Sequence, residues 1–104
     1  MTHLTRNHVS FDAGQWPLKA DRPTIVFIHG SGNNRLFWAN QLNGLTDCAN
    51  TVVIDLPGHG ESPGQGMDQV NDYAQVVEAF IEAIQAPMPV PCGLSLGGAI
   101  AIQI

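Results

Sequence analysis

The chain has 104 residues, a formal net charge of −5 at pH 7 and a hydrophobic fraction of 44%. The length suits one small domain, and a charged fraction of only 12% excludes a disordered chain or a solvated helical array. The four lysines and arginines are scattered and no apolar run would span a bilayer, so we expect neither nucleic acid nor a membrane as a partner.

The cysteines and histidines indicate neither a disulfide framework nor a metal site. Cys48 and Cys92 are expected to be reduced, with Cys92 at the end of a buried strand, which favours a cytoplasmic location. The four histidines lack the spacing of metal ligands, and His3 and His8 are expected to be solvated. The N-terminus has no apolar segment typical of a secretory signal. We therefore expect no metal and no cofactor.

The first half of the chain predicts edge strands, then a buried strand and a helix. In residues 1–22, apolar residues alternate weakly with polar ones, which indicates one or two strands at a sheet edge. Thr24–Ile28 is rich in β-branched residues and does not alternate, as in a central parallel strand buried on both faces. After the loop His29–Asn34, apolar residues at helical spacing predict a helix over Leu36–Leu45.

The second half repeats the order of strand, loop and helix. Asn50–Asp55 is predicted to be a second buried strand, and Leu56–Gly66 contains the glycines and prolines expected of a loop. An apolar stripe from Val70 to Ile84 predicts an amphipathic helix, which Asp68 would cap.

The third strand and helix enclose the most informative motif. Met88–Cys92 is predicted to be a strand and Ala99–Ile102 the start of a helix, with the pattern Gly93-x-Ser95-x-Gly97 between them. This spacing places a serine on a sharp strand-to-helix turn, where side chains two positions before and after it would clash. We interpret Ser95 as a nucleophile, and the alternative is a serine that only caps the helix.

Three strand–helix units in succession predict right-handed crossovers and a doubly wound, mostly parallel α/β sheet. Ligands bind at the carboxyl ends of the strands in such a sheet. The loops that follow Ile28 and Ile54 should meet the serine turn at this edge. The sequence therefore predicts one site, built from three loops.

Three motifs in this order resemble the α/β-hydrolase fold superfamily: His29–Gly32 (HGSG), Asp55–Ser62 (DLPGHGES) and Gly93–Gly98 (GLSLGG). The resemblance covers residues 24–104 and is closest to the branch of esterases, lactonases and carbon–carbon bond hydrolases. Leu94 stands where relatives often carry His, Tyr or Trp, which leaves the substrate subclass open.

The resemblance implies that Ser95 attacks the carbonyl carbon of a small-molecule carboxylic ester, lactone or activated carbon–carbon bond, forming an acyl-enzyme. The backbone N–H groups of Leu96 and Ser31 would form the oxyanion hole. A serine rather than an aspartate at the turn argues against the dehalogenase and epoxide-hydrolase branches. The candidates to line the substrate pocket are Asn33, Asn34 and Trp38.

The resemblance also implies that residues 1–104 are the N-terminal part of a single α/β-hydrolase domain, truncated after the nucleophile elbow. Residues 1–22 would supply edge strands, and residues 23–104 a β-α-β-α-β-elbow-α succession. In this family the acid and the histidine follow the serine, and residues 96–104 contain neither. We therefore expect the isolated chain to be inactive and poorly stable, with the elbow strand as an exposed apolar edge.

Several alternatives remain open. His29 and His59 are expected to be structural, and Asp55 is expected to hold its own loop through hydrogen bonds of the Asx type. Trp38 is equally well explained by a contact in the core. The chain could belong to an acyltransferase or a cofactor-free lyase of the same fold, or to a non-catalytic ligand-binding protein. The sequence determines neither the substrate nor the oligomeric state.

Overall fold

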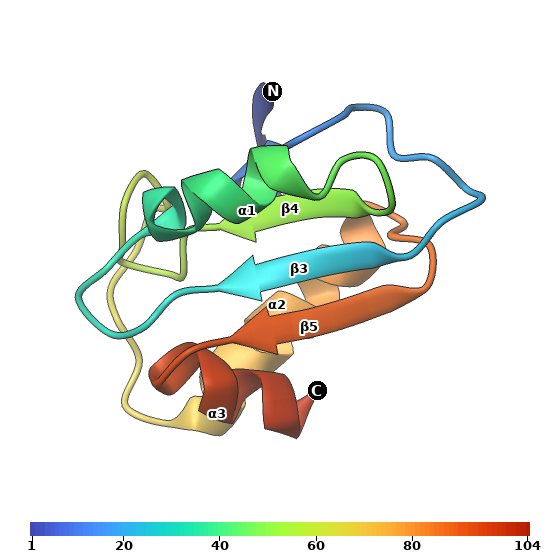
Figure 1. Cartoon of the computed structure of the whole chain (residues 1–104). Coiled ribbons are helices and arrows are strands. Elements are labelled where there is room, and N and C mark those ends of the chain that lie inside the picture. Colours follow the sequence, from blue (N-terminus) through green and yellow to red (C-terminus); the bar gives the residue numbers. More distant parts are fainter.

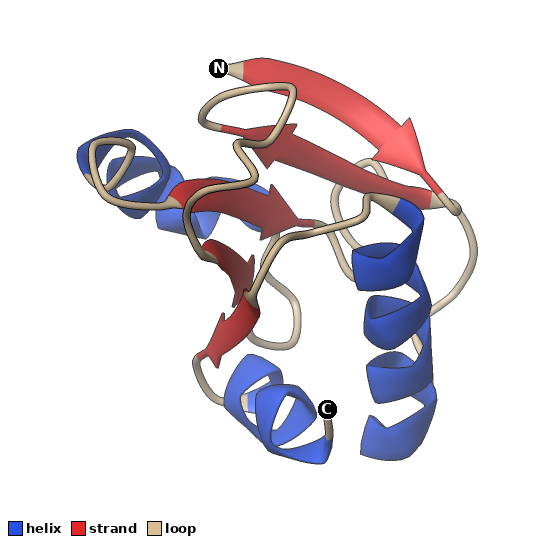
Figure 2. Cartoon of the chain, turned by 90° about the vertical axis from the view of Figure 1, so that its right-hand side faces the viewer, coloured by secondary structure: helices blue, strands red, loops and turns tan.

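A computed structural model describes residues 1–104, and in it five strands form one sheet with helices on both faces (Figures 1 and 2). The order across the sheet is β1-β2-β4-β3-β5. β3 pairs in parallel with β4 and β5, whereas β2 pairs antiparallel with β1 and β4. The α/β fold class is therefore confirmed, with an antiparallel hairpin at one edge. The strands are β1 (Thr2–Arg6), β2 (Val9–Ala13), β3 (Thr24–Ile28), β4 (Asn50–Ile54) and β5 (Pro89–Gly93).

The helices differ from the sequence prediction in two places. The helix expected over Leu36–Leu45 is a short 3₁₀ helix, η1 (Arg35–Trp38), followed by α1 (Ala39–Gly44). The second helix, α2 (Val70–Ala83), has Gln69 rather than Asp68 at its N-cap, and no side chain caps it. α1 covers one face of the sheet, and α2 and α3 (Leu96–Gln103) cover the other (Figure 2).

The central strands are buried because a neighbouring strand pairs with each of their edges and helices cover both faces of the sheet. On the face covered by α1, Phe27 and Val53 pack with Leu42. The larger core lies on the opposite face, where the apolar stripe of α2 packs against alternate residues of the strands. Its members include Phe11, Val26, Ile28, Val52, Ile54, Tyr73, Val77, Phe80 and Ile100.

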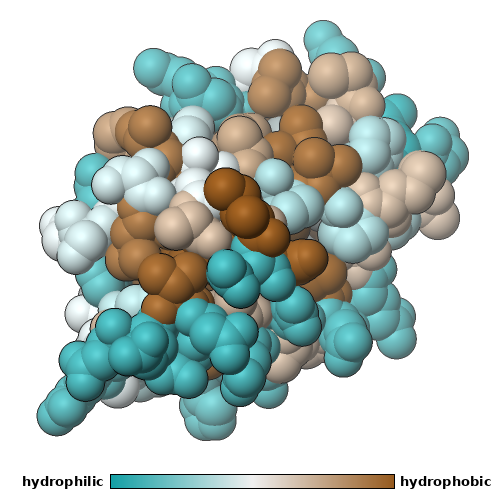
Figure 3. Space-filling model, turned by 90° about the horizontal axis from the view of Figure 1, so that it is seen from below, coloured by the Kyte–Doolittle hydropathy of each residue, from teal (hydrophilic) through white to brown (hydrophobic).

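β5 lies at the edge of the sheet and is only partly covered, as expected from its position. Met88 and Val90 are exposed, and Cys92 is half-buried rather than enclosed. Apolar side chains also reach the surface on the underside of the molecule (Figure 3). Ile102 of α3 is 84% exposed. None of the helices combines the length and the apolar character needed to cross a bilayer.

Candidate active site at the carboxyl end of β5

Ser95 lies on the turn that joins β5 to α3, with an exposed side chain. Its backbone angles are φ 59° and ψ −119°, a region that L-residues rarely adopt and that costs on the order of 1–3 kcal/mol. The turn is held against the end of β3, where Ile28 pairs with Gly93 and the Leu94 N–H donates to the Ile28 carbonyl at 3.4 Å. The tight turn predicted from the glycine spacing is therefore present.

The two glycines of the motif are required by close backbone contacts. A Cβ atom on Gly93 would overlap the carbonyl group of Gly97 across the turn. A Cβ atom on Gly97 would overlap the carbonyl oxygen of Ile28, because the first turn of α3 lies directly on the end of β3. Both obstacles are backbone atoms, which cannot move aside as a flexible side chain would. The start of α3 can approach the sheet this closely only where side chains are absent.

The loop after β3 lies next to the serine. The position of a Cβ atom on Gly30 would be 3.5 Å from Ser95 Cβ and 3.9 Å from Ser95 Oγ. The Ser31 N–H, one residue further, donates to no acceptor in the protein. The Leu96 N–H belongs to the first turn of α3, where helices leave N–H groups without intrahelical partners. The carboxyl edge thus brings the serine and the loop with the second predicted oxyanion donor together.

Two histidines connect the loops around the site. His29 is buried, its Nδ1–H donates to the Gly30 carbonyl at 2.7 Å and its Nε2 accepts from the Leu56 N–H at 3.1 Å. Burial lowers the pKa of His29, with a smaller contribution from the neighbouring His59. His59 Nε2 accepts from the Gly32 N–H at 3.1 Å, and the two rings lie 5.1 Å apart. Both imidazoles therefore bind backbone groups through both ring nitrogens.

Asp55, at the end of β4, connects two loops rather than one. Its Oδ1 accepts from the Arg35 N–H at 2.7 Å, and its Oδ2 accepts from the Arg35 guanidinium at 2.8 Å and from the Glu61 N–H at 3.1 Å. Burial alone would raise the pKa of Asp55, but these donors outweigh it and the pKa is lowered. The expectation of local Asx bonds was too narrow, because the main partner is in η1.

Arg35 is the centre of a charge cluster that sequence reasoning missed. Besides Asp55, its guanidinium lies 3.0 Å from Asp12 of β2 and 2.9 Å from Glu61. His3 Nδ1 lies 2.6 Å from the second oxygen of Asp12, so His3 is not simply solvated as expected. Asp55 and Glu61 belong to one motif, but no motif links them to Arg35, Asp12 or His3, which the order of the strands in the sheet brings close to them. The cluster braces η1, which directly follows the loop of Ser31.

Each of the three residues expected to line the substrate pocket makes a contact within the protein, and their part in binding a substrate stays a prediction. The Asn34 side chain caps η1 by accepting from the Leu36 N–H at 2.9 Å. Asn33 is exposed, and its Oδ1 accepts from the Asn34 N–H. Trp38 packs on Phe27 with ring centroids 5.0 Å apart, which is the core contact given as the alternative.

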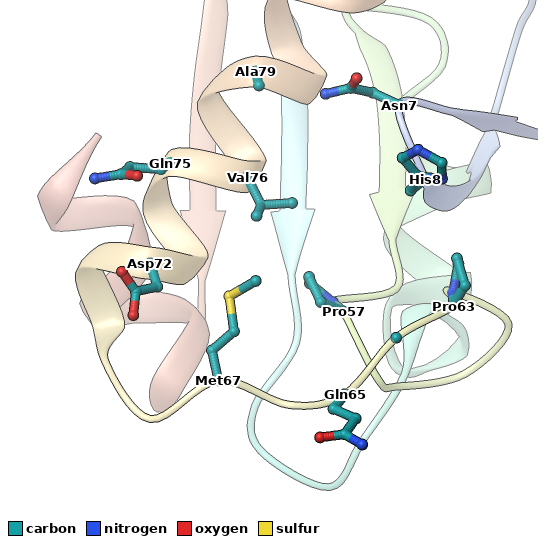
Figure 4. A pocket seen from close by; sticks show the side chains of 11 residues that line it. Asn7, His8, Pro57, Pro63, Gln65, Met67, Asp72, Gln75, Val76 and Ala79 are labelled. Atoms are coloured by element: carbon teal, nitrogen blue, oxygen red, sulfur yellow. The ribbon is translucent and has the colours of Figure 1, made fainter.

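The largest hollow lies elsewhere, between the β1–β2 turn, the loop after β4 and α2 (Figure 4). It has a volume of about 650 Å³ and is open to solvent. Pro57, Met67 and Val76 form its apolar lining, and exposed amides together with His8 and Asp72 surround it. None of these polar groups is buried without a partner, so the hollow specifies no ligand chemistry. No group of three His, Cys, Asp or Glu side chains is arranged to bind a metal.

A family model described as "Alpha/beta hydrolase family" matches residues 25–104. The chain belongs to this family. Over 86 residues it is 37% identical to the pimeloyl-[acyl-carrier protein] methyl ester esterase of Pectobacterium carotovorum, covering 82% of this chain and 32% of that protein. It is 31% identical over 81 residues to 3-oxoadipate enol-lactonase 2 of Acinetobacter baylyi, covering 77% of this chain and 30% of that protein.

The fold is also that of solved α/β-hydrolases. The structure superposes on N-acyl homoserine lactonase AidH, solved with N-butanoyl homoserine, with a TM-score of 0.78 and 24% identity. The match covers 98% of this chain and 38% of that one, and at this identity it shows the fold alone. The chain spans about a third of the length of the two curated α/β-hydrolase relatives.

Proposed function

We propose that Ser95 is the nucleophile of a hydrolase that cleaves carboxylic esters or lactones through an acyl-enzyme. The observation that carries the proposal is the geometry of residue 95, an exposed hydroxyl on a strained turn at the carboxyl edge of the sheet. A serine held at positive φ needs a reason, because such strain concentrates at functional sites. The similarity to a methyl ester esterase and an enol-lactonase supports the choice of ester and lactone carbonyls.

In the proposed reaction, Ser95 Oγ attacks the carbonyl carbon and gives up its proton to a base. The carbonyl π electrons move to oxygen, and this oxyanion accepts hydrogen bonds from the N–H groups of Ser31 and Leu96. One such donor is worth about 3 kcal/mol of barrier. Collapse of the intermediate expels the alcohol with a proton from the conjugate acid of the base, and water then hydrolyses the acyl-enzyme by the same steps. The positive end of the α3 dipole also favours the developing charge.

Neither histidine near the turn is available as the base. Both ring nitrogens of His29 and of His59 are engaged with backbone groups, and His29 is buried. In the family order the acid and the histidine follow the serine. We therefore propose that the base lies outside residues 1–104. The proposed activity belongs to the longest natural protein chain that contains these 104 residues, referred to below as the longest natural chain.

The test uses that longest chain, a fluorophosphonate label and p-nitrophenyl esters together with a lactone. Ser95→Ala is expected to abolish labelling and turnover. Thr5→Ala is the matched control, since it removes an exposed hydroxyl on the edge strand β1, and it should remain active. An unlabelled Ser95, or a Ser95→Ala variant that hydrolyses at the original rate, would refute the proposal. Products formed with an added alcohol distinguish hydrolysis from acyl transfer.

A further inference from the structure

We propose that His59 is a positioning residue: its ring holds the loop after β3 in the conformation that directs the Ser31 N–H at the oxyanion. The inference rests on the proposed function and adds a residue to it. His59 lies in the loop after β4, far from Ser31 in the sequence, and it does not touch the reacting atoms. Its action is through Gly32.

The loop after β3 is a four-residue turn with a defined shape. The Asn33 N–H donates to the Gly30 carbonyl at 3.2 Å, which makes Ser31 and Gly32 the two central residues. Gly32 has φ 75°, the positive value that a type II turn requires at its third position. Type I and type II turns differ by rotation of the central peptide group. The rotation moves the Ser31 carbonyl and the Gly32 N–H, whereas the Ser31 N–H belongs to the preceding peptide group. The direction of the Ser31 N–H therefore depends on where the turn as a whole is held, and the central peptide offers the group by which it can be held.

His59 binds the central peptide directly. Its Nε2 accepts from the Gly32 N–H at 3.1 Å, which is the group that would swing away if the peptide rotated. A ring nitrogen that accepts carries no proton, so Nδ1 carries it and donates to the Pro57 carbonyl at 3.0 Å. The bond to Gly32 therefore ties the turn, and with it the neighbouring Ser31, to the loop after β4. Rotation of the central peptide would break this bond and leave the turn free to move away from Ser95.

The imidazole itself is held from two sides. The His29 ring lies 5.1 Å away and the Tyr73 ring lies 6.4 Å away. Tyr73 is buried and its hydroxyl accepts from the Met67 N–H at 2.8 Å, so it is fixed in turn. His59 thus connects the turn beside Ser95 to α2 and to the loop after β4.

The decisive comparison is His59→Phe against His59→Gln in the longest natural chain. Phenylalanine retains a ring between His29 and Tyr73 but accepts no hydrogen bond, whereas the glutamine Oε1 can accept from the Gly32 N–H. We expect His59→Phe to lower kcat about 10-fold to 100-fold with little change in KM, because a misplaced donor weakens only the transition state. His59→Gln should recover most of the loss. Amide exchange of Gly32 should accelerate in His59→Phe only.

A second pair of variants leaves His59 untouched, so that a misfolded His59→Phe would not decide the question. Nothing lies within 4 Å of a Cβ atom on Gly32, and Gly32→Ala therefore opposes the positive φ without a clash. Asparagine tolerates positive φ far better than alanine. We expect Gly32→Ala to lower kcat and Gly32→Asn to retain most of it.

Two outcomes separate this inference from the function on which it rests. If Ser95→Ala abolishes turnover but His59→Phe and Gly32→Ala do not lower kcat, the positioning role is wrong and the proposed function stands. The same holds if His59→Gln is as impaired as His59→Phe while its Gly32 amide remains protected. If Ser95→Ala retains full turnover, the proposed function and this inference both fail.

Discussion

Arg35 and Asp55 are joined twice, by the backbone N–H of Arg35 to Oδ1 at 2.7 Å and by its guanidinium to Oδ2 at 2.8 Å. Asp55 is 0% exposed and the Arg35 side chain 13%. Asp55→Asn is expected to lower the free energy of unfolding by about 2–3 kcal/mol, because an amide NH2 cannot accept the charge-assisted hydrogen bonds that one carboxylate oxygen receives. The Arg35 guanidinium retains Asp12 and Glu61 as partners. Urea unfolding followed by circular dichroism measures the change.

Glu61→Gln provides the matched control for that variant. The Glu61 side chain also contacts the Arg35 guanidinium, at 2.9 Å, but it is 63% exposed. Its loss should cost less than about 1 kcal/mol. Equal costs for the two substitutions would contradict the view that burial makes the Asp55 contact important.

The lowered pKa of His29 makes stability depend on pH. Burial lowers this pKa from its ordinary value of 6.5, so below about pH 6.5 the unfolded chain binds a proton that the folded chain does not. The free energy of unfolding should therefore be highest above pH 6.5 and fall as the pH decreases from there. Urea titrations at several pH values from 8 to 5 would show it.

Two variants identify the group responsible for that dependence. Glutamine at position 29 can accept from the Leu56 N–H but does not titrate, so His29→Gln should flatten the curve. His8→Gln is the matched control, since it replaces an exposed histidine whose side chain makes no hydrogen bond in the protein, and the pH dependence assigned to His29 should persist in it. A curve that is the same in wild type and His29→Gln would assign the dependence to another group.

The backbone angles of Ser95 predict that the turn is under strain. Glycine adopts positive φ without penalty, whereas alanine is strained there as serine is. Ser95→Gly is expected to be more stable than Ser95→Ala by about 1 kcal/mol, after allowing for the larger entropy of unfolded glycine. Thermal unfolding of the two variants compares them directly. A less stable glycine variant would indicate that the turn is relaxed.

The contact between Gly97 and Ile28 predicts a second contrast. Gly97→Ala must displace backbone atoms of β3 and is expected to cost at least about 3 kcal/mol. Gly44 at the end of α1 has nothing within 4 Å of its Cβ position, so Gly44→Ala should be neutral or stabilise by up to about 1 kcal/mol. Chemical unfolding of both variants tests the pair, and a mild effect at Gly97 would mean that α3 can shift.

Local patterns predict the parts of this fold whose structure is decided locally. The unbroken β-branched runs of β3 and β4 can be recognised in the sequence because burial on both faces favours apolar residues at every position. The apolar stripe of α2 can be recognised because only one face of that helix packs against the sheet. The start of α2 is different. Asp68 is a suitable capping residue, but the loop before it is held by the Met67 N–H donating to Tyr73, a contact that no local rule predicts.

The candidate site divides in the same way. The glycine spacing around Ser95 predicts the turn because Gly93 and Gly97 meet within four residues, whereas the contact of Gly97 with Ile28 depends on the pairing of β5 with β3. The cluster of Arg35 with Asp12, Asp55 and Glu61 has no such signature. Arg35 and Asp12 reach Asp55 only because β3 and β2 lie on either side of β4, and that order is a property of the complete fold.

The shape of the turn between β5 and α3 is set by Gly93 and Gly97, and neither contact involves the hydroxyl of residue 95. The backbone that forms the turn therefore does not depend on which side chain residue 95 carries. A thiol or a carboxylate presented at the same position would inherit the same exposed, preformed placement without any redesign of its surroundings.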